Sequence, residues 1–170
     1  MAPCSLGRAV AVATSAAVTP TLRLVPGTFT TPLTVAAATL KPLVVVATGA
    51  TIVTSATSVS ITDGATVEIR GLTTRAPERH IVCGGSAGLP SRLVIRDAML
   101  EKSANNFGAI EVERCRLDLS TSTISMLNTE IIIAAASDST IHADRIRDRD
   151  DGLRRCLRGG LHVQQDDHLE

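Results

Sequence analysis

The sequence predicts an all-β fold, a solenoid in which short parallel strands stack coil upon coil. Short apolar stretches separated by Gly, Pro, Thr and Ser run from residue 21 to residue 143. One strand pattern recurs at an interval of roughly 20 residues, which is the signature of a repeat architecture. Aromatic residues make up only 1% of the chain, so the core must consist of Val, Ile, Leu and Ala.

The length and charge limit the classes of function. A chain of 170 residues predicts one domain. Its 17 basic and 17 acidic residues cancel, so no bulk charge attracts nucleic acid or an anionic membrane. The shortage of aromatic rings also removes platforms on which bases or sugar rings could stack. We therefore expect neither a nucleic-acid partner nor a membrane span.

The N-terminal segment predicts a cap helix within residues 1–20. Between Ser5 and Val18, the apolar positions fall on one helical face, and Ser5 is a suitable N-cap. A secretory signal is the alternative, because a basic residue precedes an apolar run and small residues follow it. That run is rich in Ala and interrupted by Thr14 and Ser15, which favours a helix packed on the strands.

Strands follow in order from residue 21, within a predicted solenoid of residues 21–143. Turns are expected at Pro26-Gly27 and Asp63-Gly64, where the residue pairs favour a reversal. The first expected strands are residues 22–24, 33–35, 43–46, 51–53 and 59–61.

A repeat in the middle of the chain predicts columns of inward side chains. Its units begin at Val67, Leu93, Ile110 and Ile131, at steps of 26, 17 and 21 residues. Stacking the units builds a continuous core. The expected inward columns are Val67, Leu93, Ile110 and Ile131; Ile69, Ile95, Val112 and Ile133; and Leu72, Ala98, Cys115 and Ala136.

The same alignment predicts two outward columns of mixed character. They are Glu68, Val94, Glu111 and Ile132, and Arg70, Arg96, Glu113 and Ala134. Arg96 is expected to pair with Glu113, an exposed ion pair worth about 0–1 kcal/mol. Two acids on separated coils are too few for calcium, which takes six to eight oxygen ligands, so no metal site is expected.

The chain resembles the right-handed parallel β-helix proteins of the pectin-lyase-like group. The resemblance rests on its opening, SLGRAVAVATSAAVTPTLRLVPGTFTTPLTV, with Pro26, Gly27, Thr28 and Phe29 at the turn, and extends over roughly residues 5–143. It implies a single-stranded right-handed parallel β-helix with a short N-terminal cap helix. Such a cap covers a sheet edge that would otherwise invite aggregation.

The resemblance also implies which catalytic groups to look for. Lyases of the group hold calcium with clustered acids and use an Arg as base, and its hydrolases show Asn-Thr-Asp, Asp-Asp, Gly-His-Gly and Arg-x-Lys motifs. These motifs do not occur together here. Asp150-Asp151 lies far from any partner motif, and His80 and His142 are isolated histidines. We therefore expect no catalytic residue and no cofactor, although an enzyme of this group stays an alternative.

Two loops are the candidate ligand-binding segments. The Gly-rich stretch at residues 84–88 lacks the Lys-Ser/Thr ending of a phosphate loop. Loops of a solenoid are the usual place for ligand contacts. The candidate residues are Gly84, Gly85, Ser86, Asn105 and Asn106.

The cysteines and the C-terminal segment leave alternatives open. Cys4, Cys83, Cys115 and Cys156 have no CxxC spacing; two disulfides are possible, but buried free thiols are favoured. Residues 144–170 alternate Arg and Asp and break the strand pattern. They are a partial cap, a disordered tail, or the product of truncation or a shifted reading frame.

These observations predict a non-catalytic scaffold of a secreted or cell-surface protein, in contact with polysaccharide. A polysaccharide lyase or glycoside hydrolase is one alternative. A fragment without independent function is another, and it would self-associate through an uncapped C-terminal coil.

Overall fold

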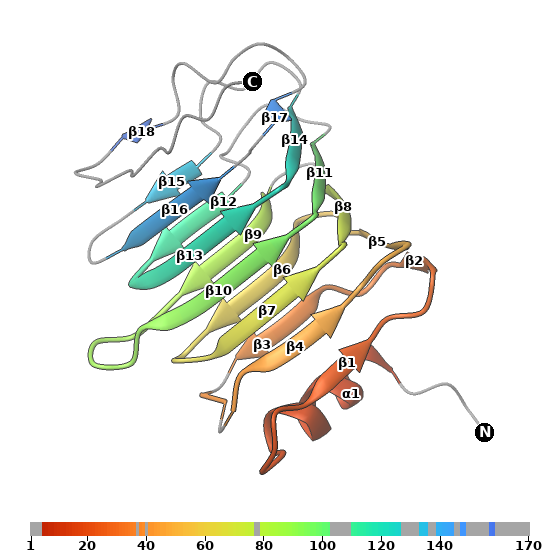
Figure 1. Cartoon of the computed structure of the whole chain (residues 1–170), viewed down its shortest axis with the longest axis vertical. Coiled ribbons are helices and arrows are strands. Elements are labelled where there is room, and N and C mark those ends of the chain that lie inside the picture. Colours follow the sequence, from red (N-terminus) through yellow and green to blue (C-terminus); the bar gives the residue numbers. More distant parts are fainter. Residues whose placement is uncertain are drawn as a thin grey trace.

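A computed structural model describes residues 5–36, 38–39, 41–76, 79–102, 110–126, 133–135, 139–144, 147–148 and 157–158. These residues form a right-handed solenoid of three parallel sheets, as predicted (Figure 1). Each coil passes through sheet A, then sheet B, then sheet C, and then rises to the next coil. All strand pairs within the three sheets are parallel.

The strands are short, as expected for a narrow solenoid. Sheet A contains β1 (Thr21–Arg23), β4 (Leu43–Val46), β7 (Thr66–Arg70), β10 (Ser91–Arg96), β13 (Cys115–Ser120) and β16 (Thr140–Asp144). Sheet B contains β2 (Gly27–Phe29), β5 (Ala50–Val53), β8 (Thr73–Ala76), β11 (Met99–Lys102), β14 (Thr123–Met126) and β17 (Arg147–Asp148). Sheet C contains β3 (Leu33–Ala36), β6 (Thr57–Thr62), β9 (Arg79–Gly84), β12 (Ile110–Glu113), β15 (Ile133–Ala135) and β18 (Leu157–Arg158).

The register of sheet A corrects the predicted repeat. Val67 pairs with Leu93, as expected, but Leu93 pairs next with Leu117, and Leu117 with Ile141. The steps are therefore 26, 24 and 24 residues. Ile110 lies in sheet C instead, between Ile81 and Ile133. The prediction failed because it counted one strand group per coil, whereas each coil has three strands.

The other predicted inward columns change for the same reason. Ile69 and Ile95 are neighbours, but Val112 pairs with Cys83 in sheet C. Leu72 and Ala98 are buried just before β8 and β11, whereas Cys115 begins β13 in sheet A. Ile131 and Ala136 lie outside the described residues.

The interior of the solenoid is a continuous aliphatic core, which confirms the composition argument. Side chains alternate along each strand, so β10 buries Ser91, Leu93 and Ile95 and turns Arg92, Val94 and Arg96 outward. Leu93 and Ile95 are at most 1% exposed. Each such Leu or Ile contributes about 1.5–3 kcal/mol by burial.

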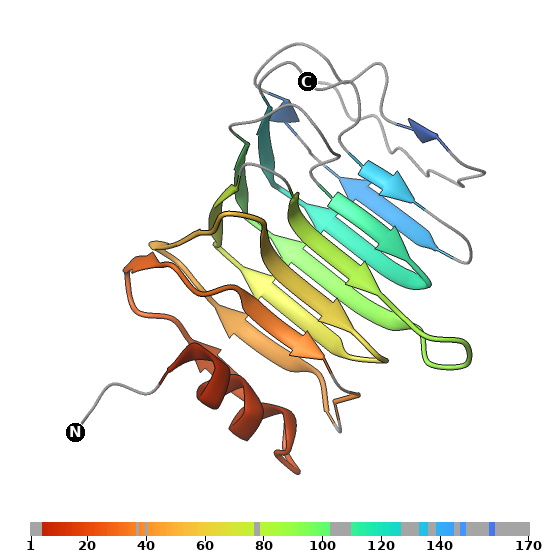
Figure 2. The same cartoon turned by 180° about the vertical axis from the view of Figure 1, so that it is seen from behind.

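Helix α1 (Leu6–Thr14) covers the first coil (Figure 2). Ser5 is its N-cap, and its hydroxyl accepts a hydrogen bond from the Arg8 N–H. Leu6 and Val10 are buried in the core. The helix ends earlier than the expected Val18, because the Ser15 hydroxyl donates to carbonyls of the last turn and the chain turns there.

The corner between sheets A and B depends on residues in the left-handed conformation. Gly71, Asp97 and Thr121 stand there with φ of 72°, 55° and 48°. A Cβ on Gly71 would lie 2.7 Å from the Thr48 hydroxyl oxygen, so this corner requires glycine. Thr121 is β-branched and is held by donating its hydroxyl hydrogen to Asp97 at 2.7 Å.

Parts of the predicted tail continue the coils. Asp144 ends β16, Arg147–Asp148 pairs with β14, and Leu157–Arg158 pairs with β15. Asp150 and Asp151 lie outside the described residues. No helix in the described part of the chain is long and apolar enough to cross a membrane.

Candidate binding face on sheet A

The outward face of sheet A gathers four arginines and two carboxylates around Val94. On β10, Arg92 and Arg96 lie two residues to either side of Val94. Glu68 on β7 and Asp118 on β13 pair in register with Val94 from the coils before and after it. Arg70 and Arg116 complete the group, which we call the arginine face: Glu68, Arg70, Arg92, Arg96, Arg116 and Asp118.

Glu68 is held by two arginines. Arg70, two residues along the same strand, donates its Nε–H to Glu68 Oε1 at 2.8 Å. Arg96, on the next coil, donates its Nε–H to the same oxygen at 3.2 Å. Only 22% of the Glu68 side chain is exposed, compared with 51% and 53% for the two arginines. The carboxylate therefore lies low between two raised guanidinium groups.

Asp118 repeats this arrangement on the other side of Val94. Arg116, two residues earlier on β13, donates its Nε–H to Asp118 at 3.3 Å. Arg92, on the preceding coil, donates from a terminal nitrogen to Asp118 Oδ2 at 3.2 Å. The carboxylate is 21% exposed and the two arginines are about half exposed.

The two clusters are related by an approximate twofold axis through Val94. Rotation by 180° exchanges Arg92 with Arg96 and Glu68 with Asp118 in the strand register. Arg70 and Arg116 exchange in the same way. Strand β10 supplies one arginine to each cluster, so the register of this single strand assembles the whole face.

The ion pairs orient the guanidinium groups and leave donors facing outward. Arg70, Arg96 and Arg116 use Nε for their carboxylate. The two terminal nitrogens of each form the planar fork that suits carboxylate, sulfate or phosphate oxygens. The face can therefore accept oxyanions without breaking the ion pairs that hold it.

The arginines hold Glu68 in its charged form. Hydrogen bonding from Arg70 lowers the pKa of Glu68, partial burial opposes this, and the charges of Arg70 and Arg96 lower it further. The same contact raises the pKa of Arg70. A general acid needs a carboxyl pKa raised toward neutrality. Glu68 is shifted in the opposite direction, so it serves to position arginines.

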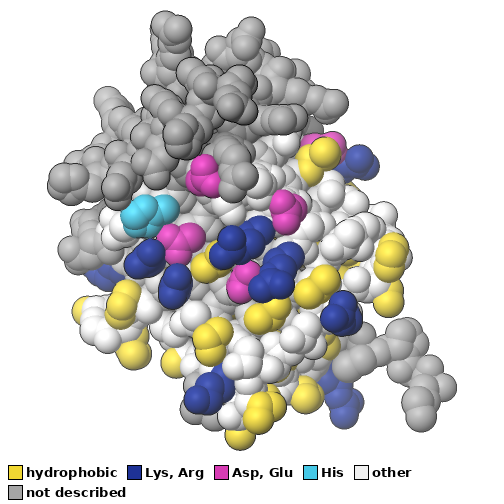
Figure 3. Space-filling model, in the orientation of Figure 1, with side chains coloured by type: hydrophobic (Ala, Val, Ile, Leu, Met, Phe, Trp, Pro, Cys, Tyr) yellow, Lys and Arg dark blue, Asp and Glu magenta, His cyan; other side chains and the backbone are white. Residues whose placement is uncertain are grey.

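The face carries a net charge of +2, because four arginines outnumber two carboxylates. Figure 3 shows basic side chains grouped around acidic ones over the middle of sheet A. Towards the first coils, Val44 and Val46 continue the outward columns; towards the last, His142 and Asp144 do so. The positive excess therefore lies on the central coils.

Sequence reasoning missed this face, and the register explains why. It placed Glu111 and Glu113 next to Val94 and Arg96, but both acids lie on β12 in sheet C. The expected pair of Arg96 with Glu113 is wrong: Arg96 contacts Glu68, and Glu113 contacts Arg114. The steps of 24 residues from Leu93 to Leu117 and Ile141 were the signal that could have found it.

The first predicted binding loop is a hairpin between β9 and β10. Ser86 and Leu89 form an antiparallel bridge at its base, and Gly88 turns its tip with φ of 81°. Gly85 packs against backbone, since a Cβ there would lie 2.3 Å from the Arg114 carbonyl oxygen. The structure thus gives Gly85 a packing role, while binding by Gly84, Gly85 and Ser86 stays a prediction.

The second predicted loop, with Asn105 and Asn106, lies outside the described residues. It connects β11 to β12, whose first residue Ile110 pairs with Ile81 near the start of β9. Gly84 ends β9. The two loops therefore leave sheet C from opposite ends of its strands.

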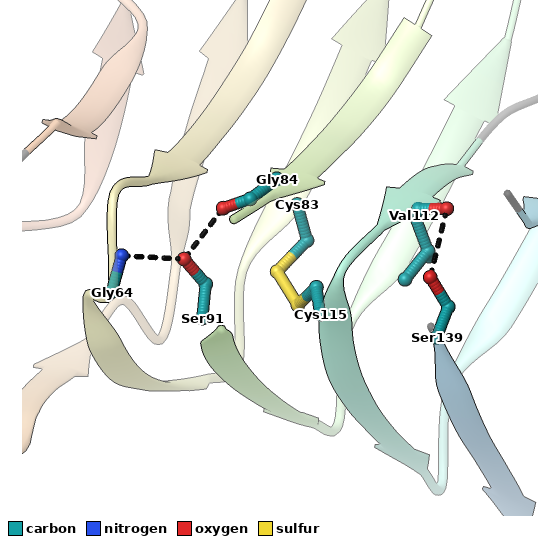
Figure 4. Close-up of a disulfide and its surroundings, with 7 residues drawn as sticks. All are labelled: Gly64, Cys83, Gly84, Ser91, Val112, Cys115 and Ser139. Carbon is teal, nitrogen blue, oxygen red and sulfur yellow. Dashed lines mark hydrogen bonds between the residues drawn. A yellow bond between two sulfur atoms is a disulfide. The ribbon is translucent and has the colours of Figure 1, made fainter. Parts of the chain in front are cut away.

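A disulfide joins Cys83 to Cys115, so the expectation of free thiols is wrong for this pair (Figure 4). Cys83 lies near the end of β9 and Cys115 begins β13 on the following coil, with Cα atoms 5.9 Å apart. Beside it, the buried Ser91 donates its hydroxyl hydrogen to the Gly84 carbonyl and accepts from the Gly64 N–H. Cys4 and Cys156 lie outside the described residues.

The two isolated histidines occupy different surroundings. His80 is fully buried, and its Nδ1 lies 2.7 Å from the Thr74 hydroxyl in the core between sheets B and C. His142 is partly exposed on β16, in register with Asp118. Among the described residues, no group of three or more His, Cys, Asp or Glu could hold a metal ion.

The fold and the face stand without a relative to interpret them. No protein family, curated protein or solved structure matches this chain. The architecture established here is a parallel β-solenoid with an N-terminal helix.

Proposed function

We propose that this chain is a non-catalytic scaffold of a secreted or cell-surface protein, a β-helix of the pectin-lyase-like kind that presents its outer faces to polysaccharide. Three features support the proposal: the disulfide, the paired carboxylates and the regular outward columns of sheet A. The disulfide carries it, because it bears on the compartment in which the chain folds.

The Cys83–Cys115 bond favours an oxidising compartment. Disulfides persist in secreted and cell-surface proteins and are rare in the cytosol, where thiols are kept reduced. The Cα separation of 5.9 Å lies within the ordinary range for a disulfide. The bond spans 32 residues and joins neighbouring coils. Closing a loop of that length stabilises the fold by about 3–4 kcal/mol in the chain-entropy account.

The paired carboxylates favour a scaffold over a hydrolase or lyase. Glycoside hydrolysis needs one carboxyl group that can give up a proton near neutral pH. Glu68 and Asp118 instead each contact two arginines, and the pKa of Glu68 is lowered. Groups held in this way stabilise a surface.

Thiol mapping tests the proposal. The full chain is produced in an oxidising secretory compartment, denatured and alkylated without reductant. We expect the peptides of Cys83 and Cys115 to appear linked, and to separate and alkylate only after reduction. A Cys83→Ser/Cys115→Ser variant is the control for assigning that peptide. Alkylation of both cysteines without reductant would contradict the oxidising compartment and with it the proposed scaffold role.

A further inference from the structure

We propose that the arginine face is a binding site for a sulfated polysaccharide. The proposal rests on the proposed scaffold function, which it deepens by naming the site and the chemistry of the ligand. The face lies on sheet A, away from the two loops that sequence reasoning selected. Its argument comes from the number, spacing and orientation of the guanidinium groups.

Neighbouring arginine forks suit a tetrahedral oxyanion. Arg92 and Arg116 are paired in register, as are Arg70 and Arg96, so each couple is separated by about 4.8 Å at the backbone. One fork already satisfies both oxygens of a carboxylate. A sulfate ester has three terminal oxygens and can accept from two forks at once. Each couple is therefore better matched to a sulfate than to a uronate carboxylate.

The spacing of the two couples requires a ligand with several anionic groups. Arg92 and Arg96 lie four residues apart on β10, or about 13 Å along the strand. Each couple is exposed, and a single exposed ion pair contributes little. A polymer that reaches both couples gains from the high effective concentration of its second sulfate. Two sulfates, each of one negative charge, would neutralise the net charge of +2.

The surroundings favour a glycan over a nucleic acid. The centre of the face is Val94, and no aromatic side chain lies on the described strands of sheet A. Binding of single-stranded nucleic acid relies on aromatic rings that stack on bases. Sulfated polysaccharides are polymers of the extracellular space, which agrees with the compartment that the disulfide favours.

The test is binding of the full, disulfide-intact chain to dextran sulfate, measured by titration calorimetry at low salt and repeated at rising salt. Uncharged dextran, polygalacturonate and single-stranded DNA are the comparison polymers. Two variants probe the face: Arg92→Gln/Arg96→Gln removes the arms on β10, and Arg70→Gln/Arg116→Gln removes the outer arms. The matched control, Arg75→Gln/Arg79→Gln, removes two ion-paired arginines from sheets B and C.

We expect dextran sulfate to bind, with affinity falling as salt rises. Each sheet A variant should weaken binding by about tenfold, the value of one lost charge-assisted contact at an exposed site, while the control stays within about twofold. Circular dichroism and thermal melting confirm that each variant is folded, and either sheet A variant suffices if the other does not fold.

Several results would overturn the proposal. They are an absence of dextran sulfate binding at low salt, an equal loss of binding in the control variant, and binding of polygalacturonate or DNA that is as tight as that of dextran sulfate. Thiol mapping is independent of these results. A linked Cys83–Cys115 peptide without sulfate-specific binding would refute the site and leave the scaffold proposal standing, whereas free thiols would refute the scaffold.

Discussion

Sheets A and B belong to the same coils but present different outer surfaces. On sheet A, each central carboxylate is shared by two arginines, which leaves a positive excess. On sheet B, Arg75 pairs with Glu101 one to one, beside a column that contains Thr28, Thr51, Thr73, Met99 and Thr123. The charge of a face is therefore set by which outward residues the register aligns, and not by the solenoid itself.

The interiors of the two sheets differ as well. The inward column of sheet A is aliphatic throughout: Leu43, Val67, Leu93, Leu117 and Ile141. The corresponding column of sheet B runs through Ile52, Leu100 and Ile124 but includes the buried Thr74. Thr74 is tied to His80 of sheet C, so sheet B depends on a polar contact where sheet A depends on packing alone.

Truncation of the sheet A core has the largest expected effect. Leu93 is fully buried in the middle of its column. We expect Leu93→Ala to lower the free energy of unfolding by about 2–5 kcal/mol, since it removes packing and leaves a cavity. Urea unfolding followed by circular dichroism measures it, with Val94→Ala on the outer face as control. An equal loss in both variants would contradict the alternation of buried and exposed residues on β10.

An apolar replacement in sheet B should also destabilise the fold, though less. Thr74→Val keeps the shape of the side chain and removes the hydroxyl that contacts His80 Nδ1. Loss of a buried partner costs about 1–3 kcal/mol, which outweighs the added apolar surface. The same unfolding measurement applies. A Thr74→Val variant more stable than the parent chain would show that this contact contributes nothing to sheet B.

The smallest expected effect is the pH dependence from Glu68. Its pKa is lower in the folded chain than in the unfolded chain. It therefore stabilises the fold fully above the unfolded pKa of about 4.3, and this stabilisation is lost as the pH falls through the lower folded pKa. For a partly exposed group we expect less than about 1 kcal/mol. Unfolding at pH 6 and about pH 3 measures it, and Glu68→Gln should flatten the difference. An unchanged pH dependence in that variant would contradict the role assigned to the arginine contacts.

The sequence was sufficient for the fold but not for the face. The aliphatic composition and the short strands predicted the solenoid, and Ser5 with Leu6 and Val10 predicted the helix. Those signals are local, because they depend on residues a few positions apart. The face depends on which residues 24 or 26 positions apart lie side by side. Apolar patterns from sheets A and C look alike, so the sequence assigned Ile110 to the column of Leu93.

The disulfide shows the same limit. Cys83 and Cys115 lie 32 residues apart and belong to different sheets. They meet only because β9 ends at the corner from which sheet A begins, one coil apart. Once the three-strand coil is known, their proximity follows. Without it, neither their spacing nor their number distinguishes a disulfide from two buried thiols.

The central claim is the register that places Asp118, and not Glu111, beside Val94. Engineered cross-linking tests it most directly, because in-register neighbours lie within the Cα separation that a disulfide spans. Under mild oxidation of the otherwise unchanged chain, we predict that Val94→Cys/Asp118→Cys forms a 94–118 linked peptide and that Val94→Cys/Glu111→Cys forms no 94–111 link. A 94–111 link without a 94–118 link would contradict the register and dismantle the arginine face.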